Sequence, residues 1–208
     1  MKKLFASVLV GAMMLMGTNA FAQLSVGGGY INSTETSTYT VGNTSTSSKA
    51  DLNGFYVGGQ YNIKLVKGLG VAPGLYFSGL FGKRTDNYYI TTGEAKFTEL
   101  SINVPVNVNY TFELGRDLNL IAYAGPNFQY GVSSKGTYDV VGTTTTTNYY
   151  DEDHNRNPFN IYIGGGVGIQ AGPFQVILGY DHSLTNMIKR DNVKVGRSQI
   201  KIGAGYAF

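Results

Sequence analysis

Three consecutive residues, Asp181, His182 and Ser183, carry the side chains that serine hydrolases use as acid, base and nucleophile. The base must lie within hydrogen-bond distance of the nucleophile that it activates. The flanking residues alternate apolar and polar side chains as in a β-strand, and neighbouring strand residues point to opposite faces. We therefore expect His182 to face away from Asp181 and Ser183, and the sequence predicts no enzyme.

A second candidate site is the acidic run 151–155, Asp-Glu-Asp-His-Asn. Oxygen ligands at alternate positions are typical of the start of a calcium-binding loop. Arg156 stands where such a loop needs glycine, and the closing glutamate is missing. A solvated loop is the favoured interpretation and calcium binding stays open. No other metal and no cofactor is predicted, and the lack of cysteine excludes disulfides and thiolate chemistry.

The elements that would position these residues are strands. The clearest signal is in residues 96–112, where apolar side chains from Leu100 to Tyr110 alternate with polar ones, a period of two that no helix produces. We predict eight strands: Leu24–Asn32, Gly54–Leu65, Gly70–Gly82, Lys96–Phe112, Asp117–Val132, Asn160–Gln170, Pro173–Leu184 and Val193–Phe208. Pro73, Pro105 and Pro126 lie inside them, where we expect bulges or gaps in the hydrogen-bond ladder.

The connections between these strands alternate in length. The long ones are predicted at Ser33–Asn53, Lys83–Ala95, Ser133–Phe159 and Thr185–Asn192, and the short ones at Val66–Leu69, Glu113–Arg116 and Ala171–Gly172. Transmembrane barrels have long extracellular loops and short periplasmic turns. An even number of strands then places both termini in the periplasm.

The N-terminus has the pattern of an export signal. Lys2 and Lys3 precede an apolar stretch over 4–17, which is shorter than the roughly 20 residues of a spanning helix. Small residues then predict cleavage after Ala22, which leaves Gln23 as the first residue; cleavage after Ala20 is the alternative. Residues 1–22 are thus expected to be a signal peptide and 23–208 one barrel domain. Lys2 and Lys3 also supply part of the net charge of +3, so the charge gives no argument for nucleic-acid binding.

These patterns together predict an all-β protein, an antiparallel up-and-down transmembrane barrel. Apolar side chains would face lipid, and polar or small ones the lumen. The ring must be closed because an unpaired backbone group in hydrocarbon costs several kcal/mol. The lumen of eight strands is about wide enough for side chains alone. We expect a polar network there, which either plugs the barrel or lines a narrow channel: Lys64, Glu99, Asp181, Arg197 and Lys201.

The chain resembles the "porin family" of Gram-negative outer-membrane barrels and the small OmpA/OmpX-type barrels. The likeness rests on the runs 100–105 (Leu-Ser-Ile-Asn-Val-Pro) with Tyr110, 124–126 (Ala-Gly-Pro), 164–168, 180–186 and 203–208. It implies location in the outer membrane. It also implies that the terminal aromatic residues, Tyr206 and Phe208, are read by the barrel assembly machinery.

The predicted function is a non-enzymatic, OmpX/OmpA-like barrel that displays Ser/Thr-rich loops, with a role in envelope integrity or adhesion. The alternatives are a small porin for ions or solutes and a lipid-modifying enzyme. Expected partners are outer-membrane lipid, the assembly machinery and a surface or host ligand, but no nucleic acid, and the protein is expected to be a monomer.

Overall fold

Nine β-strands make up most of the described chain. A computed structural model describes residues 22–42, 44–85, 94–140, 143–150, 156–188 and 193–208. The strands are β1 Ala22–Val41, β2 Thr44–Val66, β3 Leu69–Thr85, β4 Glu94–Glu113, β5 Leu118–Val140, β6 Thr143–Asn148, β7 Phe159–Ala171, β8 Phe174–Ser183 and β9 Val193–Ala207. These ranges contain no helix of the length and apolarity that a membrane span requires.

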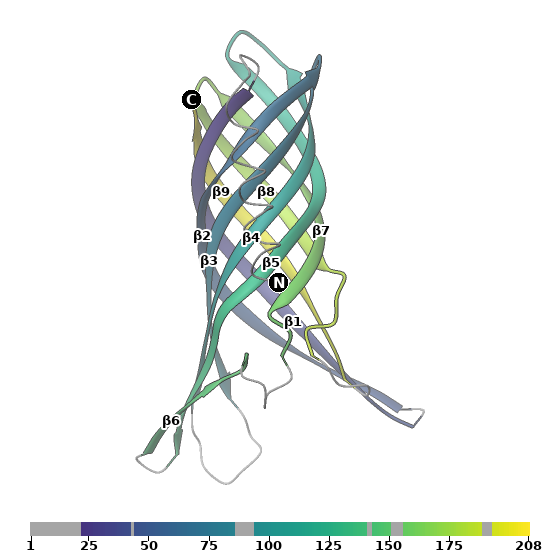
Figure 1. Cartoon of the computed structure of the whole chain (residues 1–208), viewed down its shortest axis with the longest axis vertical. Coiled ribbons are helices and arrows are strands. Elements are labelled where there is room, and N and C mark those ends of the chain that lie inside the picture. Colours follow the sequence, from purple (N-terminus) through teal and green to yellow (C-terminus); the bar gives the residue numbers. More distant parts are fainter. Residues whose placement is uncertain (1–21, 43, 86–93, 141–142, 151–155, 189–192) are drawn as a thin grey trace, which may run out of the picture.

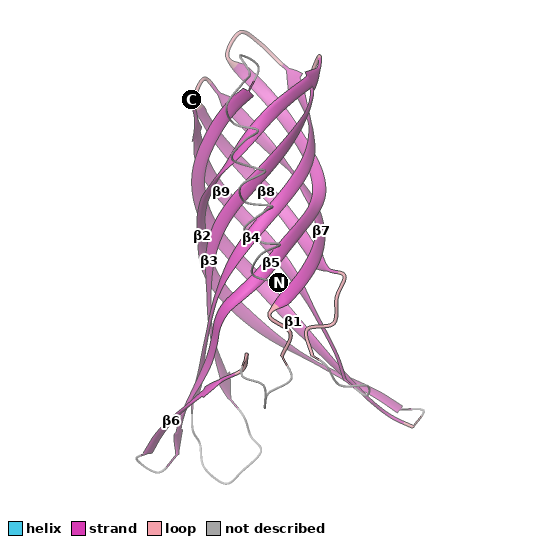
Figure 2. Cartoon of the chain, viewed as in Figure 1, coloured by secondary structure: helices cyan, strands magenta, loops and turns pink. Residues whose placement is uncertain are grey.

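Eight of the strands close into a ring (Figures 1 and 2). Every pairing is antiparallel, and β1 pairs with β9, with Gly28 opposite Ala204, to join the two ends of the chain. The short strand β6 pairs only with β5 among the described residues and lies outside the ring. The predicted eight-stranded barrel is therefore confirmed, with one additional strand beyond it.

The three predicted short turns are confirmed. They join β2 to β3, β4 to β5 and β7 to β8 at one end of the barrel, and β1 begins and β9 ends at that same end (Figure 1). Gly68 and Gly172 lie in two of these turns with φ of 77° and 56°, a left-handed conformation that favours glycine. We call this end the turn end and the opposite end the loop end.

At the loop end the strands continue well beyond the predicted limits. The segment Ser33–Asn53, expected to be a loop, is mostly paired strand, with Val41 opposite Thr44 at its tip. The expected loops Lys83–Ala95 and Ser133–Phe159 likewise contain the ends of β3, β4 and β5 and all of β6. The alternation is hard to see there because both faces are polar. The strand-forming preference of threonine is the local reason that the ladder persists.

The outward face of the ring carries an apolar band. Large apolar side chains are exposed on it along all eight strands, including Val26, Val57, Phe77, Leu100, Val108, Val167, Leu178 and Ile202. Exposed aromatic side chains lie at both limits: Tyr110, Phe112, Phe174, Tyr206 and Phe208 towards the turn end, and Tyr30, Phe55, Phe81, Tyr130 and Tyr180 towards the loop end. This is the arrangement of a barrel embedded in lipid.

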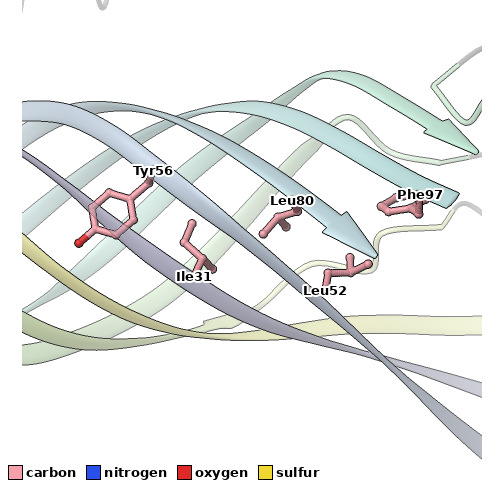
Figure 3. Close-up of a cluster of buried hydrophobic side chains, with 5 residues drawn as sticks. All are labelled: Ile31, Leu52, Tyr56, Leu80 and Phe97. Atoms are coloured by element: carbon pink, nitrogen blue, oxygen red, sulfur yellow. The ribbon is translucent and has the colours of Figure 1, made fainter. Parts of the chain in front are cut away.

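The lumen is not polar throughout, which corrects the sequence-based expectation. Ile31, Leu52, Tyr56, Leu80 and Phe97 point inward and form a buried apolar cluster (Figure 3). Burial alternates along these strands, and each of the five residues falls on the buried, inward side. The cluster begins level with the exposed Phe55 and Val57 of the apolar band and extends towards the loop end, and packing these side chains against one another removes their apolar surface from water in the lumen.

The three prolines interrupt the ladder locally. The β2–β3 register passes from Gln60–Gly74 to Ile63–Val71 without paired residues between them, next to Pro73. Comparable interruptions follow Pro73 in the β3–β4 pairing and Pro105 in the β4–β5 pairing. Pro126 lies in the second of these gaps, whereas its pairing with Ile163 of β7 is continuous. A proline has no N–H to donate, so the gaps expected from the sequence occur where that donor is missing.

Candidate functional site

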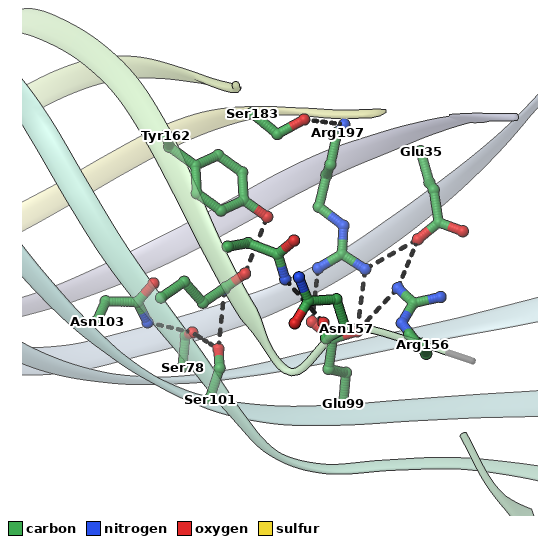
Figure 4. Close-up of polar contacts among 12 residues, drawn as sticks. Glu35, Ser78, Glu99, Ser101, Asn103, Arg156, Asn157, Tyr162, Ser183 and Arg197 are labelled. Atoms are coloured by element: carbon green, nitrogen blue, oxygen red, sulfur yellow. Dashed lines mark hydrogen bonds and ion pairs between the residues drawn. The ribbon is translucent and has the colours of Figure 1, made fainter. Parts of the chain in front are cut away.

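Four charged side chains meet inside the barrel near its loop end (Figure 4). Glu35 comes from β1, Glu99 from β4 and Arg197 from β9, while Arg156 lies in the segment that precedes β7. Arg197 Nη2 lies 2.9 Å from Glu35 Oε2 and 3.0 Å from Glu99 Oε2. Arg156 Nη2 lies 2.7 Å from Glu35 Oε2 and 3.2 Å from Glu99 Oε2. We call these four residues the charge cluster.

The charge cluster is buried and electrically balanced. The side chains of Arg197 and Glu99 are 0% and 1% exposed, and those of Arg156 and Glu35 are 8% and 4% exposed. Two carboxylates and two guanidinium groups cancel, and each carboxylate accepts from both arginines. Such charges tolerate burial only when they are paired and hydrogen-bonded in this way. The cluster therefore behaves as one unit, in which loss of any member leaves a buried charge uncompensated.

The charge cluster lies at the loop-end limit of the apolar band, where Glu99 follows Thr98 and precedes the exposed Leu100. The outward neighbours of Glu35 on β1 are Thr34 and Thr36, and those of Arg197 on β9 are Gly196 and Ser198. Arg156 belongs to no strand. Burial alone would lower the pKa of its guanidinium, but Glu35 and Glu99 raise that pKa above the ordinary value for arginine. Arg156 is therefore a permanent cation.

A second polar layer lies beside the charge cluster, deeper in the barrel. Tyr162 Oη donates to Gln129 Oε1 at 2.8 Å, and Gln129 Nε2 donates to Ser101 Oγ at 3.0 Å. Ser101 in turn shares a hydrogen bond with Ser78, which also accepts from Asn103 Nδ2 (Figure 4). Tyr162 is fully buried and Gln129 is nearly so. The two layers together fill the loop-end half of the lumen with side chains.

The other half of the lumen is more open. Lys201 pairs with Asp181, whose carboxylate also accepts from Asn127 Nδ2 at 3.3 Å. These three residues line a cavity of about 90 Å³. A larger cavity of about 590 Å³ lies at the turn end and is lined by Lys64. Both cavities are also lined by Asn109 and Ile121, so the open part of the lumen begins at the turn end and stops at the packed layers.

The five lumen residues named from the sequence are thus divided among three places. Glu99 and Arg197 lie in the charge cluster, Asp181 and Lys201 form a separate pair, and Lys64 lies at the mouth of the turn end. Sequence reasoning missed Glu35 and Arg156, because both fall in segments predicted to be loops. Continuing the alternation of β1 past Asn32 places Glu35 on the lumen face. Nothing in the sequence indicates that Arg156 turns back into the barrel.

The residues of the apparent triad are separated as predicted. Asp181 and Ser183 are buried in the lumen, whereas His182 is exposed on the outward face. His182 does meet a serine of the neighbouring strand, since its Nδ1 lies 3.0 Å from Ser198 Oγ. Ser198 Oγ also accepts from Tyr180 Oη at 3.1 Å. This contact arises from the β8–β9 register, in which His182 stands opposite Ser198.

Two other sequence-based predictions concern the ends of the chain and one loop. Phe208 N donates to Leu24 O at 2.8 Å, which fixes the C-terminus beside β1, and the ring of Tyr206 lies 5.0 Å from that of Phe208. Their role as an assembly signal stays a prediction. The run 151–155 lies outside the described residues, as do residues 1–21 of the expected signal peptide. Within the described ranges, no three His, Asp or Glu side chains are grouped as a metal site would require.

Comparison with known proteins identifies the family to which the chain belongs. The family model of the outer membrane protein beta-barrel domain matches residues 17–189, and the chain belongs to this family. It is a protein of the Gram-negative outer membrane. Among curated proteins, no match is found.

Several solved structures are similar to this chain. Ail of Yersinia pestis, in complex with the heparin analogue sucrose octasulfate, shares 17% identity with a TM-score of 0.48, over 90% of this chain and 99% of Ail. Neisserial surface protein A shares 13% with a TM-score of 0.42, over 91% and 98%. The outer membrane protease OmpT of Escherichia coli shares 10% with a TM-score of 0.44, over 92% and 99%. The family does not decide whether its members are enzymes.

Proposed function

We propose that this barrel is a non-enzymatic surface protein that presents a rigid protruding sheet to partners outside the cell. The observation that carries this proposal is the continuous pairing of three strands beyond the apolar band. On β1 the outward side chains change to Asn32, Thr34, Thr36 and Thr38, yet β1 stays paired with β2 up to Val41 and with β9 up to Tyr39. We call this three-stranded extension the protruding sheet.

Side-chain hydrogen bonds support the protruding sheet on its outward face. Thr34 Oγ1 donates to Asp51 Oδ1 at 2.7 Å. Further towards the tip, the hydroxyl groups of Thr38 and Ser47 are 3.0 Å apart, and those of Thr40 and Ser45 are 3.1 Å apart. Cross-strand pairs of this kind each add a few tenths of a kcal/mol to about 1 kcal/mol. The expected Ser/Thr-rich display surface is therefore an ordered sheet.

The protruding sheet has one unpaired edge. The pairing of β2 with β3 ends at Asn53 opposite Phe81, so residues 44–50 of β2 have no paired strand on that side among the described residues. An exposed edge offers backbone donors and acceptors to an incoming chain, and proteins recognise extended peptides by adding a strand there. A surface partner could bind through this edge as well as through the hydroxyl-rich face.

The packed lumen supports display in preference to transport. The charge cluster and the Tyr162 layer include the fully buried side chains of Arg197, Glu99, Gln129 and Tyr162. A solute could pass only by separating these buried pairs, and breaking a buried ion pair costs several kcal/mol of free energy. The small-porin alternative therefore needs a rearrangement of the loop-end half of the barrel.

A lipid-modifying hydrolase is the second candidate, favoured by the contact between His182 and Ser198. This pair lies directly beyond the exposed rings of the apolar band, at the height where lipid headgroups meet acyl chains. The pair nevertheless lacks the third group of a triad, because Asp181 points into the lumen and binds Lys201. The hydrolase ranks below display for that reason.

Processing and topology complete the proposal. Cleavage after Ala22 would leave Gln23 at the start of β1, and both termini would lie in the periplasm because they share the turn end. The barrel would act as a monomer, inserted by the assembly machinery through Tyr206 and Phe208. N-terminal sequencing of the mature protein tests the first point, since a start at Phe21 would show cleavage after Ala20 instead.

The display function is tested by shortening the protruding sheet. Residues 38–47 are replaced by a two-residue Asn-Gly turn, which keeps Ser37 opposite Ser48. A matched control variant shortens the β5–β6 ribbon by replacing 138–145 with the same turn, which keeps Thr137 opposite Thr146. Adhesion of bacteria that carry each variant to surfaces coated with host matrix is compared, after heat-modifiable gel mobility shows that the barrels are folded. Loss of adhesion confined to the first variant supports the proposal, whereas unchanged adhesion contradicts it.

A further inference from the structure

The open half of the lumen is a pocket with two connected parts. The outer part, of about 590 Å³, lies at the turn end, and the inner part, of about 90 Å³, extends to Ser78 and Asn103 of the Tyr162 layer. Asn109 and Ile121 line both parts and mark the passage between them. Small-molecule sites have volumes of about 300–1,000 Å³, so the outer part is large enough for a ligand. We call the two parts together the turn-end pocket.

A glycine of β3 lets two amide groups meet at the passage. Asn109 Nδ2 on β4 donates to Asn62 Oδ1 on β2 at 3.0 Å, although β3 lies between these strands. The residue of β3 that pairs with Asn109 is Gly70, where a Cβ would stand 2.7 Å from the side-chain oxygen of each asparagine. A larger residue would push the amides apart, so the absence of a side chain at Gly70 allows this hydrogen bond.

Three buried polar atoms that belong to the lining of the inner part have no hydrogen-bond partner among the described residues. They are Tyr56 Oη, Asn109 Oδ1 and Asn127 Oδ1. These residues are only 9%, 6% and 5% exposed. The Tyr56 hydroxyl points away from the other four side chains of the apolar cluster (Figure 3). A buried polar group without a partner is costly and rare, and one occupant of the inner part could satisfy all three.

The unpaired atoms define the chemistry of that occupant. The amide oxygens of Asn109 and Asn127 only accept, whereas the hydroxyl of Tyr56 both donates and accepts. An ammonium group only donates and a carboxylate only accepts, but a ligand hydroxyl can do both. Asp181 and Lys201 are the charged residues in the lining of the inner part, and they pair with each other. The inner part is therefore electrically balanced and suits a neutral ligand with several hydroxyl groups.

Aromatic rings supply the apolar side of the site. Tyr56, Tyr76 and Tyr123 line the inner part, and the rings of Tyr56 and Tyr76 stand edge to face with their centroids 5.8 Å apart. Aromatic rings offer a large and rigid apolar contact area. A sugar ring has hydroxyl groups around its rim and C–H groups on its faces, so it can use the amides and the tyrosines together.

We propose that the turn-end pocket binds a neutral sugar of one or two rings. One ring reaches the unpaired atoms of Tyr56, Asn109 and Asn127, and the outer part, which adds the amides of Gln23, Asn119 and Gln170, has room for a second ring. The open lumen stops at the packed layers, so the sugar is bound and does not pass through. This inference concerns the end of the barrel opposite the protruding sheet, goes beyond surface display and does not depend on it.

The test titrates the refolded mature barrel with glucose and maltose in an amine-oxide detergent, which has no sugar headgroup. Binding is followed by calorimetry and by the NMR shifts of the asparagine side-chain amide groups. Glucosamine at mildly acidic pH and glucuronate add one positive or one negative charge to the same frame and serve as charged controls. We expect the neutral sugars to bind and the charged analogues to bind about tenfold more weakly, because an unpaired charge is costly to bury.

Two tyrosine variants separate sugar binding from folding. Tyr56→Phe removes only an unpaired hydroxyl, so the affinity for glucose should fall about two- to tenfold while the unfolding midpoint in guanidinium does not fall. The matched control, Tyr162→Phe, removes a buried hydroxyl outside the pocket that donates to Gln129. That variant should unfold at a lower guanidinium concentration and keep its affinity for glucose within about twofold.

Three results would overturn the inference. If neither neutral sugar gives heat or NMR shifts over the millimolar range, the pocket holds water only. If the charged analogues bind as tightly as glucose, the pocket does not select a neutral hydroxylated ligand. If Tyr56→Phe is folded by heat-modifiable gel mobility and binds glucose as tightly as the unmodified barrel does, the sugar does not reach the inner part. Adhesion of the variants with a shortened protruding sheet has no bearing on any of them.

Discussion

Arg156 Nη2 lies 2.7 Å from Glu35 Oε2, although 121 residues separate the two in the chain. This pair joins the segment before β7 to the far wall of the barrel and completes a cluster in which every charge is matched. The same segment is held at its base, where Asn157 N donates to Met187 O at 2.8 Å and Gly131 N donates to Pro158 O at 2.7 Å. Residues 156–158 are thus hydrogen-bonded to β1, to β5 and to the segment after β8.

Removing one charge of the cluster should destabilise the barrel strongly. Arg197→Gln leaves Glu35 and Glu99 with a single arginine between them, and loss of one partner of a buried pair costs about 3–5 kcal/mol. The free energy of unfolding in detergent, measured by guanidinium titration, should fall by that amount. The exposed Lys194→Gln on the same strand should change it by less than about 0.5 kcal/mol. The double variant Arg197→Gln/Glu99→Gln should recover part of the loss, and no difference between Arg197→Gln and Lys194→Gln would contradict a coupled cluster.

Two glycines of β9 should respond differently to the same substitution. A Cβ on Gly203 would collide with the hydroxyl of Tyr56, whereas one on Gly196 would meet only Ser183 Oγ at 3.5 Å, an ordinary contact. Gly203→Ala should therefore lower the unfolding free energy by about 1–3 kcal/mol through overpacking, and Gly196→Ala should not. Adding Tyr56→Phe removes the nearest colliding atom but leaves the backbone oxygen of Gly28 at 2.8 Å, so it should restore only part of the loss. Equal effects at both glycines would show that the lumen is less tightly packed than its contacts indicate.

The barrel should not conduct ions in a planar bilayer. Its loop-end half is filled by the charge cluster and the Tyr162 layer, so we expect no reproducible open steps at moderate voltage. A known porin refolded in the same way serves as the positive control. Regular steps of constant size would instead favour the porin alternative.

Substitution of the outward histidine and serine should leave membrane lipids unchanged. His182→Ala and Ser198→Ala remove the base and hydroxyl of the second candidate function, and Ser183→Ala serves as a lumen-facing control. Lipid extracts from cells that express each form, analysed by mass spectrometry, should show identical acyl composition. A deacylated lipid that appears only when both His182 and Ser198 are intact would establish an enzyme.

Some features were predictable because they depend on periodicity. Alternation over Leu100–Tyr110 indicates a strand, and the short connections indicate that three turns share one end of the barrel. The outward direction of His182 also follows from local geometry, since the two faces of a strand are fixed by a period of two. These predictions need only near neighbours in the sequence.

Features that depend on distant partners were not predictable. Glu35 belongs to the lumen only because the pairing of β1 with β2 and β9 continues beyond the membrane. Its partner Arg156 is positioned by contacts to residues 131 and 187, far from it in the chain. The contact of His182 with Ser198 depends on the β8–β9 register, which the sequence leaves open.

The sequence by itself determined a closed antiparallel barrel with an apolar exterior. Alternating hydrophobicity and short turns are local properties of the chain, and lipid requires that every strand has an apolar outward face and is paired on both sides. The tertiary structure decided which charged side chains meet in the charge cluster. It also decided which residues of β5 face the lumen and which face outward. Ser101 pairs with Gly131 and Leu100 with Ser133, so that Val132 is an extra residue in β5. This β-bulge sends Lys135 outward and Ser134 inward, the reverse of what simple alternation from Tyr130 predicts. The physical reason is that a bulge is set by the fit between two strands, and that fit exists only once both are in place.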